Sequence, residues 1–131
     1  MPDSDIRILE TEAFFRVERA RTPLKFGAVI QDAITLCHVR VRAENRRGAV
    51  AEGWGAIFLS DFWAFPTPAI PHETKDLAMR RLVDCFCRRL ASFPGFAHPL
   101  DIFTEVEGDL SALNRQAGAE AGLAEEMPYL A

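Results

Sequence analysis

The chain has 131 residues, of which 49% are hydrophobic and 26% are charged, and its formal net charge is −4. This length suits one domain with a single core, and the composition excludes disorder over the chain as a whole. The negative balance argues against a nucleic-acid partner, because phosphate binding needs a concentrated positive patch. No apolar run approaches the length of a membrane span, so we expect no membrane partner.

The cysteines indicate a reducing compartment. Cys37, Cys85 and Cys87 give an odd count without a CxxC pair. A disulfide framework needs pairs, and a zinc site usually needs four ligands at suitable spacing. The first residues carry neither the basic nor the apolar region of a secretory signal. We therefore expect three reduced thiols, no metal site in this chain, and a cytoplasmic location.

The first half of the chain has the two-residue period of β-strands. A β-rich run covers residues 6–17, and the charged segment that follows, closed by Pro23, is expected to be a loop. Residues 37–43 alternate apolar and polar side chains, which predicts a second strand with one buried face. A turn at residues 45–48, with Gly48 able to adopt a positive φ, then predicts a hairpin.

The third strand is expected over residues 49–58, antiparallel to the second. Glycines flank Trp54 on both sides, and glycine inside a strand often marks a bulge or a close backbone approach. We therefore expect residues 53–55 to interrupt this strand. The prolines of the following segment predict an irregular connection rather than a helix.

From Pro71 onward the apolar period changes to three and four residues. It predicts a helix that ends before Pro94, with four arginines on its solvated face. A second helical stretch is expected to begin near Pro99, and residues 108–109 could divide it into two helices. Strands followed by helices predict an α+β domain: a three-stranded antiparallel β-meander followed by a helical bundle packed on one face.

The residue pattern contains no recognisable catalytic motif. The histidines His38, His72 and His98 are expected on a strand face, before a helix and in a turn, without the spacing of a metal-binding pair. No phosphate-binding glycine loop and no nucleophile motif is present. Asp101 and Glu105 are four residues apart, but such pairs are most often surface charges. We therefore expect no catalytic residue in this chain.

The aromatic density of residues 54–65 is the unusual feature, since both tryptophans lie here. Two interpretations remain open. The aromatic side chains could pack against the helices as core, or they could form an exposed apolar rim that meets a partner or a ligand.

Two short motifs carry a resemblance to a known family. Residues 23–27 (PLKFG), then a β-hairpin, then residues 52–56 (EGWGA), resemble the start of the mandelate racemase and muconate-lactonizing branch of the enolase superfamily. The order of elements, their spacing and the change to helices near residue 71 agree with that branch. The resemblance covers essentially the whole chain. It departs from the family pattern at Ala56, where many members have an acidic group, and in the length of residues 59–70.

The resemblance implies that this chain is an amino-terminal capping domain. In such proteins two loops of this domain close over the substrate of a catalytic (β/α)-barrel, and here they correspond to residues 19–27 and 53–63. The implied ligand-facing or barrel-facing residues are Lys25, Phe26, Trp54, Phe62 and Trp63. The implied partners are the barrel, in cis or in trans, and a small acid or sugar-acid substrate.

The chemistry that the resemblance implies lies in the barrel. The family stabilises an enediolate with Mg²⁺, which barrel residues hold, in lyases, dehydratases and racemases. This chain would then gate and line the site without catalysing. The alternative is a stand-alone binding or oligomerisation module that uses the aromatic 54–65 segment, and either role makes self-association through an apolar patch plausible.

Overall fold

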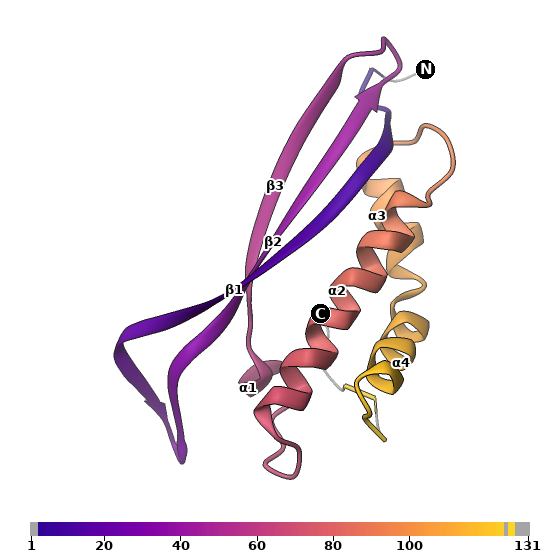
Figure 1. The fold of residues 1–131 in the computed structure, drawn as a ribbon. Helices are drawn as coiled ribbons and strands as arrows, with labels where there is room; N and C mark the ends of the chain where they lie inside the picture. Colours follow the sequence, from indigo (N-terminus) through magenta and orange to yellow (C-terminus); the bar gives the residue numbers. More distant parts are fainter. Residues whose placement is uncertain (1–2, 125, 128–131) are drawn as a thin grey trace.

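Three antiparallel strands and four helices make up residues 3–124 and 126–127, which are the residues described by this computed structural model. The elements are β1 (Ile6–Phe26), β2 (Val29–Asn45), β3 (Val50–Leu59), α1 (Asp61–Ala64), α2 (His72–Ala91), α3 (Pro99–Glu107) and α4 (Leu110–Glu120). The sheet order is β1-β2-β3, and the helices lie on one face of the sheet (Figure 1). The predicted α+β class with a three-stranded meander is confirmed.

The two hairpins turn at glycines with positive φ. Gly27 (φ 57°) lies between β1 and β2, and Gly48 (φ 79°) lies between β2 and β3, as predicted. The side-chain oxygen of Asn45 accepts hydrogen bonds from the backbone N–H groups of Arg47 and Ala49, at 3.0 and 2.9 Å. This Asx-type bonding closes the second turn and sets the register of β3.

The loop predicted after residue 17 is not a loop. β1 continues to Phe26, although its pairing shifts between Arg19 and Leu24, where four residues of β1 face a single residue of β2. Charged side chains are tolerated there because this part of the hairpin extends beyond the helices into solvent (Figure 1). Pro23 lies within the irregular stretch, where its missing N–H leaves no ladder bond unmade.

The interruption predicted in β3 is also wrong. The ladder between β2 and β3 runs without a register shift from Glu44↔Val50 to Thr35↔Leu59. A Cβ placed on Gly53 or Gly55 would meet no atom within 4 Å, so these glycines do not mark a close approach. Backbone pairing with β2 is sufficient to hold both residues extended.

The core lies between the sheet and the helices in two clusters. One gathers Cys37 and Leu59 from the sheet with Ala78 and Met79 from α2, and the other packs Ile8 against Ile102 and Val106 of α3. Further lining comes from half-buried groups of the predicted stripe, namely Leu82, Val83, Phe86 and Leu90. The predicted helix from residue 71 is therefore confirmed as α2.

The helical half follows its predicted boundaries closely. Pro99 is the first residue of α3, and the ring Nδ1 of His98 accepts a hydrogen bond from the Leu100 N–H at 3.2 Å. Gly108 and Asp109 separate α3 from α4, as expected. A backbone bridge between Ile6 and Ala97 ties the start of β1 to the connection before α3. No described helix is long and apolar enough to cross a membrane.

The arginines of α2 do not all lie on a solvated face. Arg80 turns toward the sheet, where it donates to the Thr35 hydroxyl at 3.1 Å and lies 5.3 Å from the centre of the Phe15 ring. Arg89 pairs with Asp109 at 2.6 Å and with Glu105 at 3.5 Å, which links α2 to the α3–α4 segment. The long aliphatic stem of arginine lets it cover apolar surface while its charge is paired.

Candidate functional site

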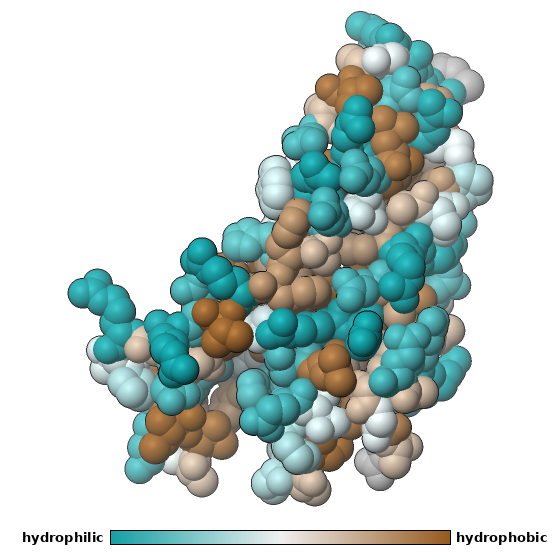
Figure 2. All heavy atoms as spheres, in the orientation of Figure 1, coloured by the Kyte–Doolittle hydropathy of each residue, from teal (hydrophilic) through white to brown (hydrophobic). Residues whose placement is uncertain are grey.

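The tip of the first hairpin and helix α1 together form an exposed apolar surface. We call it the hairpin-tip patch, and it consists of Leu24, Phe26, Val29, Phe62 and Trp63. Trp63 is 71% exposed, while Leu24, Phe26 and Val29 are each about half exposed. Figure 2 shows hydrophobic side chains gathered at the tip of the hairpin, which projects away from the helical layer.

Ring contacts join the two segments of the patch. The centroids of Phe26 and Phe62 are 5.2 Å apart, and those of Phe62 and Trp63 are 5.4 Å apart in an edge-to-face arrangement. Contacts of this kind contribute about 0.5–1.5 kcal/mol beyond the burial of area. The short helix α1 begins directly after β3, since the Ser60 carbonyl accepts hydrogen bonds from the N–H groups of Trp63 and Ala64. Phe62 therefore lies close to the end of the sheet, where its ring contacts the hairpin.

Three of the five predicted site residues are thus brought together, and two are not. Lys25 precedes Phe26 in the strand and therefore points to the opposite side of the hairpin. Trp54 lies in the middle of β3 on the sheet face away from the helices, where it stacks on Phe14 at 5.7 Å with 28° between the rings. The Trp54 side chain is 61% exposed, and because it lies on this outer face it belongs to a surface separate from the hairpin-tip patch.

The aromatic segment 54–65 is therefore not one loop with one environment. Its first part is strand, its middle is α1, and its last aromatic, Phe65, is 5% exposed within the core. The residues divide between the two interpretations made from the sequence: Phe65 packs as core, and Trp63 is exposed. The side-chain alternation of β3 places Trp54 on a different face from Phe62 and Trp63. The sequence analysis missed this because it expected the strand to be interrupted at residues 53–55.

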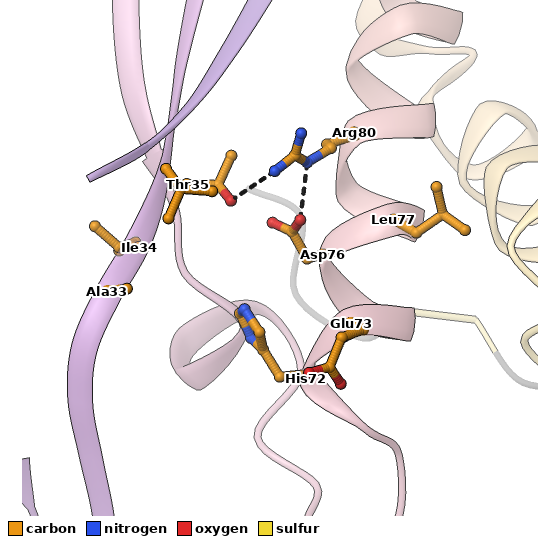
Figure 3. Close-up of a pocket in the computed structure, with 9 residues that line it drawn as sticks. Ala33, Ile34, Thr35, His72, Glu73, Asp76, Leu77 and Arg80 are labelled. Carbon is orange, nitrogen blue, oxygen red and sulfur yellow. Dashed lines mark hydrogen bonds and ion pairs between the residues drawn. The ribbon is translucent and has the colours of Figure 1, made fainter. Parts of the chain in front are cut away.

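Two crevices adjoin the patch on the helix side of the hairpin. One, of about 340 Å³, is lined by residues 29–33 of β2 together with Asp61, Phe62 and His72. The second, of about 350 Å³, lies between the strands and the first half of α2, and shares Ala33 and His72 with the first (Figure 3). The first crevice includes Val29 and Phe62 of the patch, and the second reaches Arg80.

Charged groups that line these crevices, and Lys75 beside them, are paired with one another. His72 Nδ1 lies 3.1 Å from Asp61 Oδ2, and Lys75 Nζ lies 3.8 Å from the same oxygen. Arg80 Nε donates to Asp76 Oδ2 at 2.8 Å, and Figure 3 shows its guanidinium reaching toward Thr35. Asp76 Oδ1 is buried and has no hydrogen-bond partner among the described residues.

The three cysteines are buried free thiols, in agreement with the expectation of reduced cysteines. Burial raises the pKa of all three thiols. The nearby Asp84 carboxylate adds to this effect for Cys37 and Cys87, and the pKa of Cys87 is raised to about 11. A thiol with a raised pKa is a poor nucleophile, because the thiolate is the reactive form. Among residues 3–124 and 126–127, no group of three His, Cys, Asp or Glu side chains is placed to hold a metal ion.

The exposed hairpin-tip patch lies beside crevices whose histidine and arginine, His72 and Arg80, are paired with carboxylates. Comparison of the chain with protein-family models, with curated proteins and with solved structures found no match.

Proposed function

We propose that this chain is the amino-terminal capping domain of a mandelate racemase-like protein of the enolase superfamily. The observation that carries the proposal is the contact between Phe26 and Phe62. It joins the two segments that the sequence resemblance identifies as capping loops, in the ranges 19–27 and 53–63. Two segments must lie side by side if both are to cover one substrate.

The exposure of the patch supports a partner surface. Isolated apolar residues on a surface need no explanation, but a contiguous group on a projecting hairpin is typical of an interaction site. Leu24, Phe26 and Trp63 would meet the barrel or the substrate and exclude water from the closed site. Lys25, on the other side of the hairpin, would meet the rim of the barrel.

The course of the chain is compatible with a barrel at this end of the molecule. Ala121, Leu123 and Met127 pack in the same cluster as Phe65 and Ile70, which follow α1. The last described residue, Met127, therefore packs beside the segment that follows α1. The proposed role is to line and gate a site for a small acid or sugar acid, and the Mg²⁺ would be held by residues of the barrel.

Limited trypsin digestion tests the proposal. The hairpin offers exposed cleavage sites at Arg19, Arg21 and Lys25, and the far end of the sheet offers Arg47, whose side chain is 73% exposed. We expect the isolated 131-residue chain to be cut at both ends. In the protein purified from its native source, we expect the hairpin sites to be protected and Arg47 to be cut at an unchanged rate.

Arg47 acts as the internal control, since it lies at the opposite end of β2 from the hairpin tip. Equal cleavage of the hairpin sites in both samples would contradict a cap covered by a barrel. Protection that also extends to Arg47 would indicate general rigidity rather than a covered hairpin tip.

A further inference from the structure

The outer edge of β3 is a regular strand edge that pairs with no described strand. The sheet order β1-β2-β3 leaves one side of β3 without pairing from any described strand, along all ten of its residues. An open edge presents a row of backbone N–H and C=O groups that can pair with another extended chain. The edge is distinct from the hairpin-tip patch, because its centre lies at Trp54 and Gly55, on the part of the sheet above α1 (Figure 1).

The other edge of the sheet is protected, and that of β3 is not. β1 has two register shifts, contains Pro23, and is bridged at its start to Ala97. These are devices that keep strand edges from pairing. β3 contains no proline, lysine or bulge, and its one charged residue, Glu52, is bonded to Arg40 at 3.3 Å.

Small residues leave room for an approaching strand. Gly53 and Gly55 have open space where a side chain would be, and Ala51 and Ala56 are exposed. Ile57 is 65% exposed, although its partner across the ladder, Cys37, is 1% exposed. The helices therefore cover β2 and the end of β3 at Leu59, but they leave the helix-side face of β3 open from Gly53 to Ile57, where an added strand would pair.

We propose that β3 pairs antiparallel with β3 of a second copy of this chain, which joins two sheets into one of six strands. The charge pattern of β3 places no repulsion against a second copy as the occupant. With the two-fold axis at Trp54 or at Gly55, Glu52 lies opposite Ala56 or Phe58 of the partner, so no like charges face each other. The axis at Trp54 would also set the two indole rings side by side, and thereby extend the stack on Phe14 across the interface. This pairing is independent of the proposed capping role.

Sedimentation velocity tests the proposal. The 131-residue chain is measured over a concentration series and compared with two matched variants, Gly53→Lys and Ile30→Lys. Both variants add one lysine at an exposed position, one on the β3 edge and one on the hairpin beside the patch. We expect the parent chain to form a dimer, Gly53→Lys to raise its Kd by at least about tenfold because each copy brings one added charge into the interface, and Ile30→Lys to leave it unchanged. Circular dichroism of each variant establishes that it is folded.

Cysteine cross-linking supplies a second readout, which also gives the register. Residues directly opposite each other in antiparallel strands have Cα atoms about 4.5–5.5 Å apart, within the range that a disulfide spans. We expect Trp54→Cys or Gly55→Cys to form a covalent dimer under mild oxidation, while the parent chain with its buried thiols does not. A chain that stays monomeric throughout, or a dimer that Ile30→Lys disrupts and Gly53→Lys does not, would overturn the proposal.

Discussion

Replacing Phe62 by alanine should release the first hairpin from the body of the domain without unfolding the domain. Phe62 is the residue of α1 whose ring contacts the hairpin, through Phe26 at 5.2 Å. Its other ring contact is to Trp63, within α1 itself. The variant therefore removes one aromatic pair that spans the two segments, which is worth about 0.5–1.5 kcal/mol.

That energy converts directly into a change in local opening. If the hairpin tip opens independently of the core, the loss of the pair alone should make amide hydrogen exchange in residues 24–31 about 2- to 13-fold faster, and the apolar contact area lost with the ring adds to this effect. Exchange in α2 should stay at the rate of the parent chain, because the core beneath α2 does not include Phe62. Hydrogen exchange followed by mass spectrometry of peptides resolves the two regions.

Trp63→Ala is the matched control for this measurement. It removes an aromatic side chain from the same short helix but leaves the pair between Phe26 and Phe62 intact. We expect hairpin exchange to be unchanged in this variant. The reasoning is refuted if Phe62→Ala leaves the hairpin rates unchanged, or if Trp63→Ala accelerates them equally.

Three further predictions concern the rest of the fold. Ile102→Ala should lower the free energy of unfolding in urea by about 2–5 kcal/mol, because the side chain is 2% exposed in the cluster beneath α3; a loss below 1 kcal/mol would contradict that packing. Gly48→Ala should cost about 1–2 kcal/mol in the same assay because φ is 79°, whereas Gly53→Ala, without a positive φ, should be nearly neutral; equal effects would be evidence against the turn geometry. The Cys87 thiol has its pKa raised by burial from 9.0 to about 11, so the unfolded chain loses this proton first and stability should fall as pH rises from 9 to 11. Cys87→Ala should flatten that part of the pH profile, and an unchanged slope in the variant would assign the effect to another group.

The sequence was most informative where local period and burial coincide. The alternation of residues 37–43 and the three- and four-residue spacing of α2 each reflect one element with one buried face, and both predictions are confirmed. Pro99 and Gly108 marked helix boundaries through local chemistry: proline has a fixed φ that suits a first helical turn, and glycine lowers helix propensity because its backbone is so free.

The errors occur where distant residues decide the outcome. Residues 18–26 carry charges and a proline, yet the strand continues through them because β2 pairs with it on both sides of the irregular stretch at residues 20–23. Pairing with β2 also keeps Gly53 and Gly55 in extended conformation within β3. Arg80 faces the sheet because Thr35 and Asp76 accept its hydrogen bonds, and no helical period reveals such partners. Pairing across a sheet is set by tertiary contacts, which outweigh local propensity.

The candidate site could be predicted in part for the same reason. Phe26, Phe62 and Trp63 were named from the sequence, and they do lie together. Trp54 was grouped with them because it is close in sequence, but the alternation of a strand places it on the far face with Phe14. Proximity in sequence is a good guide within α1 and a poor one within β3.

The measurement that tests the capping proposal most directly is the intact mass of the native protein, detected with an antibody raised against the 131-residue chain. The proposal predicts a product about 250 residues longer, the length of a fused (β/α)-barrel, or a stable complex with a separate chain of about that length. A native product of 131 residues that purifies without such a partner would contradict it.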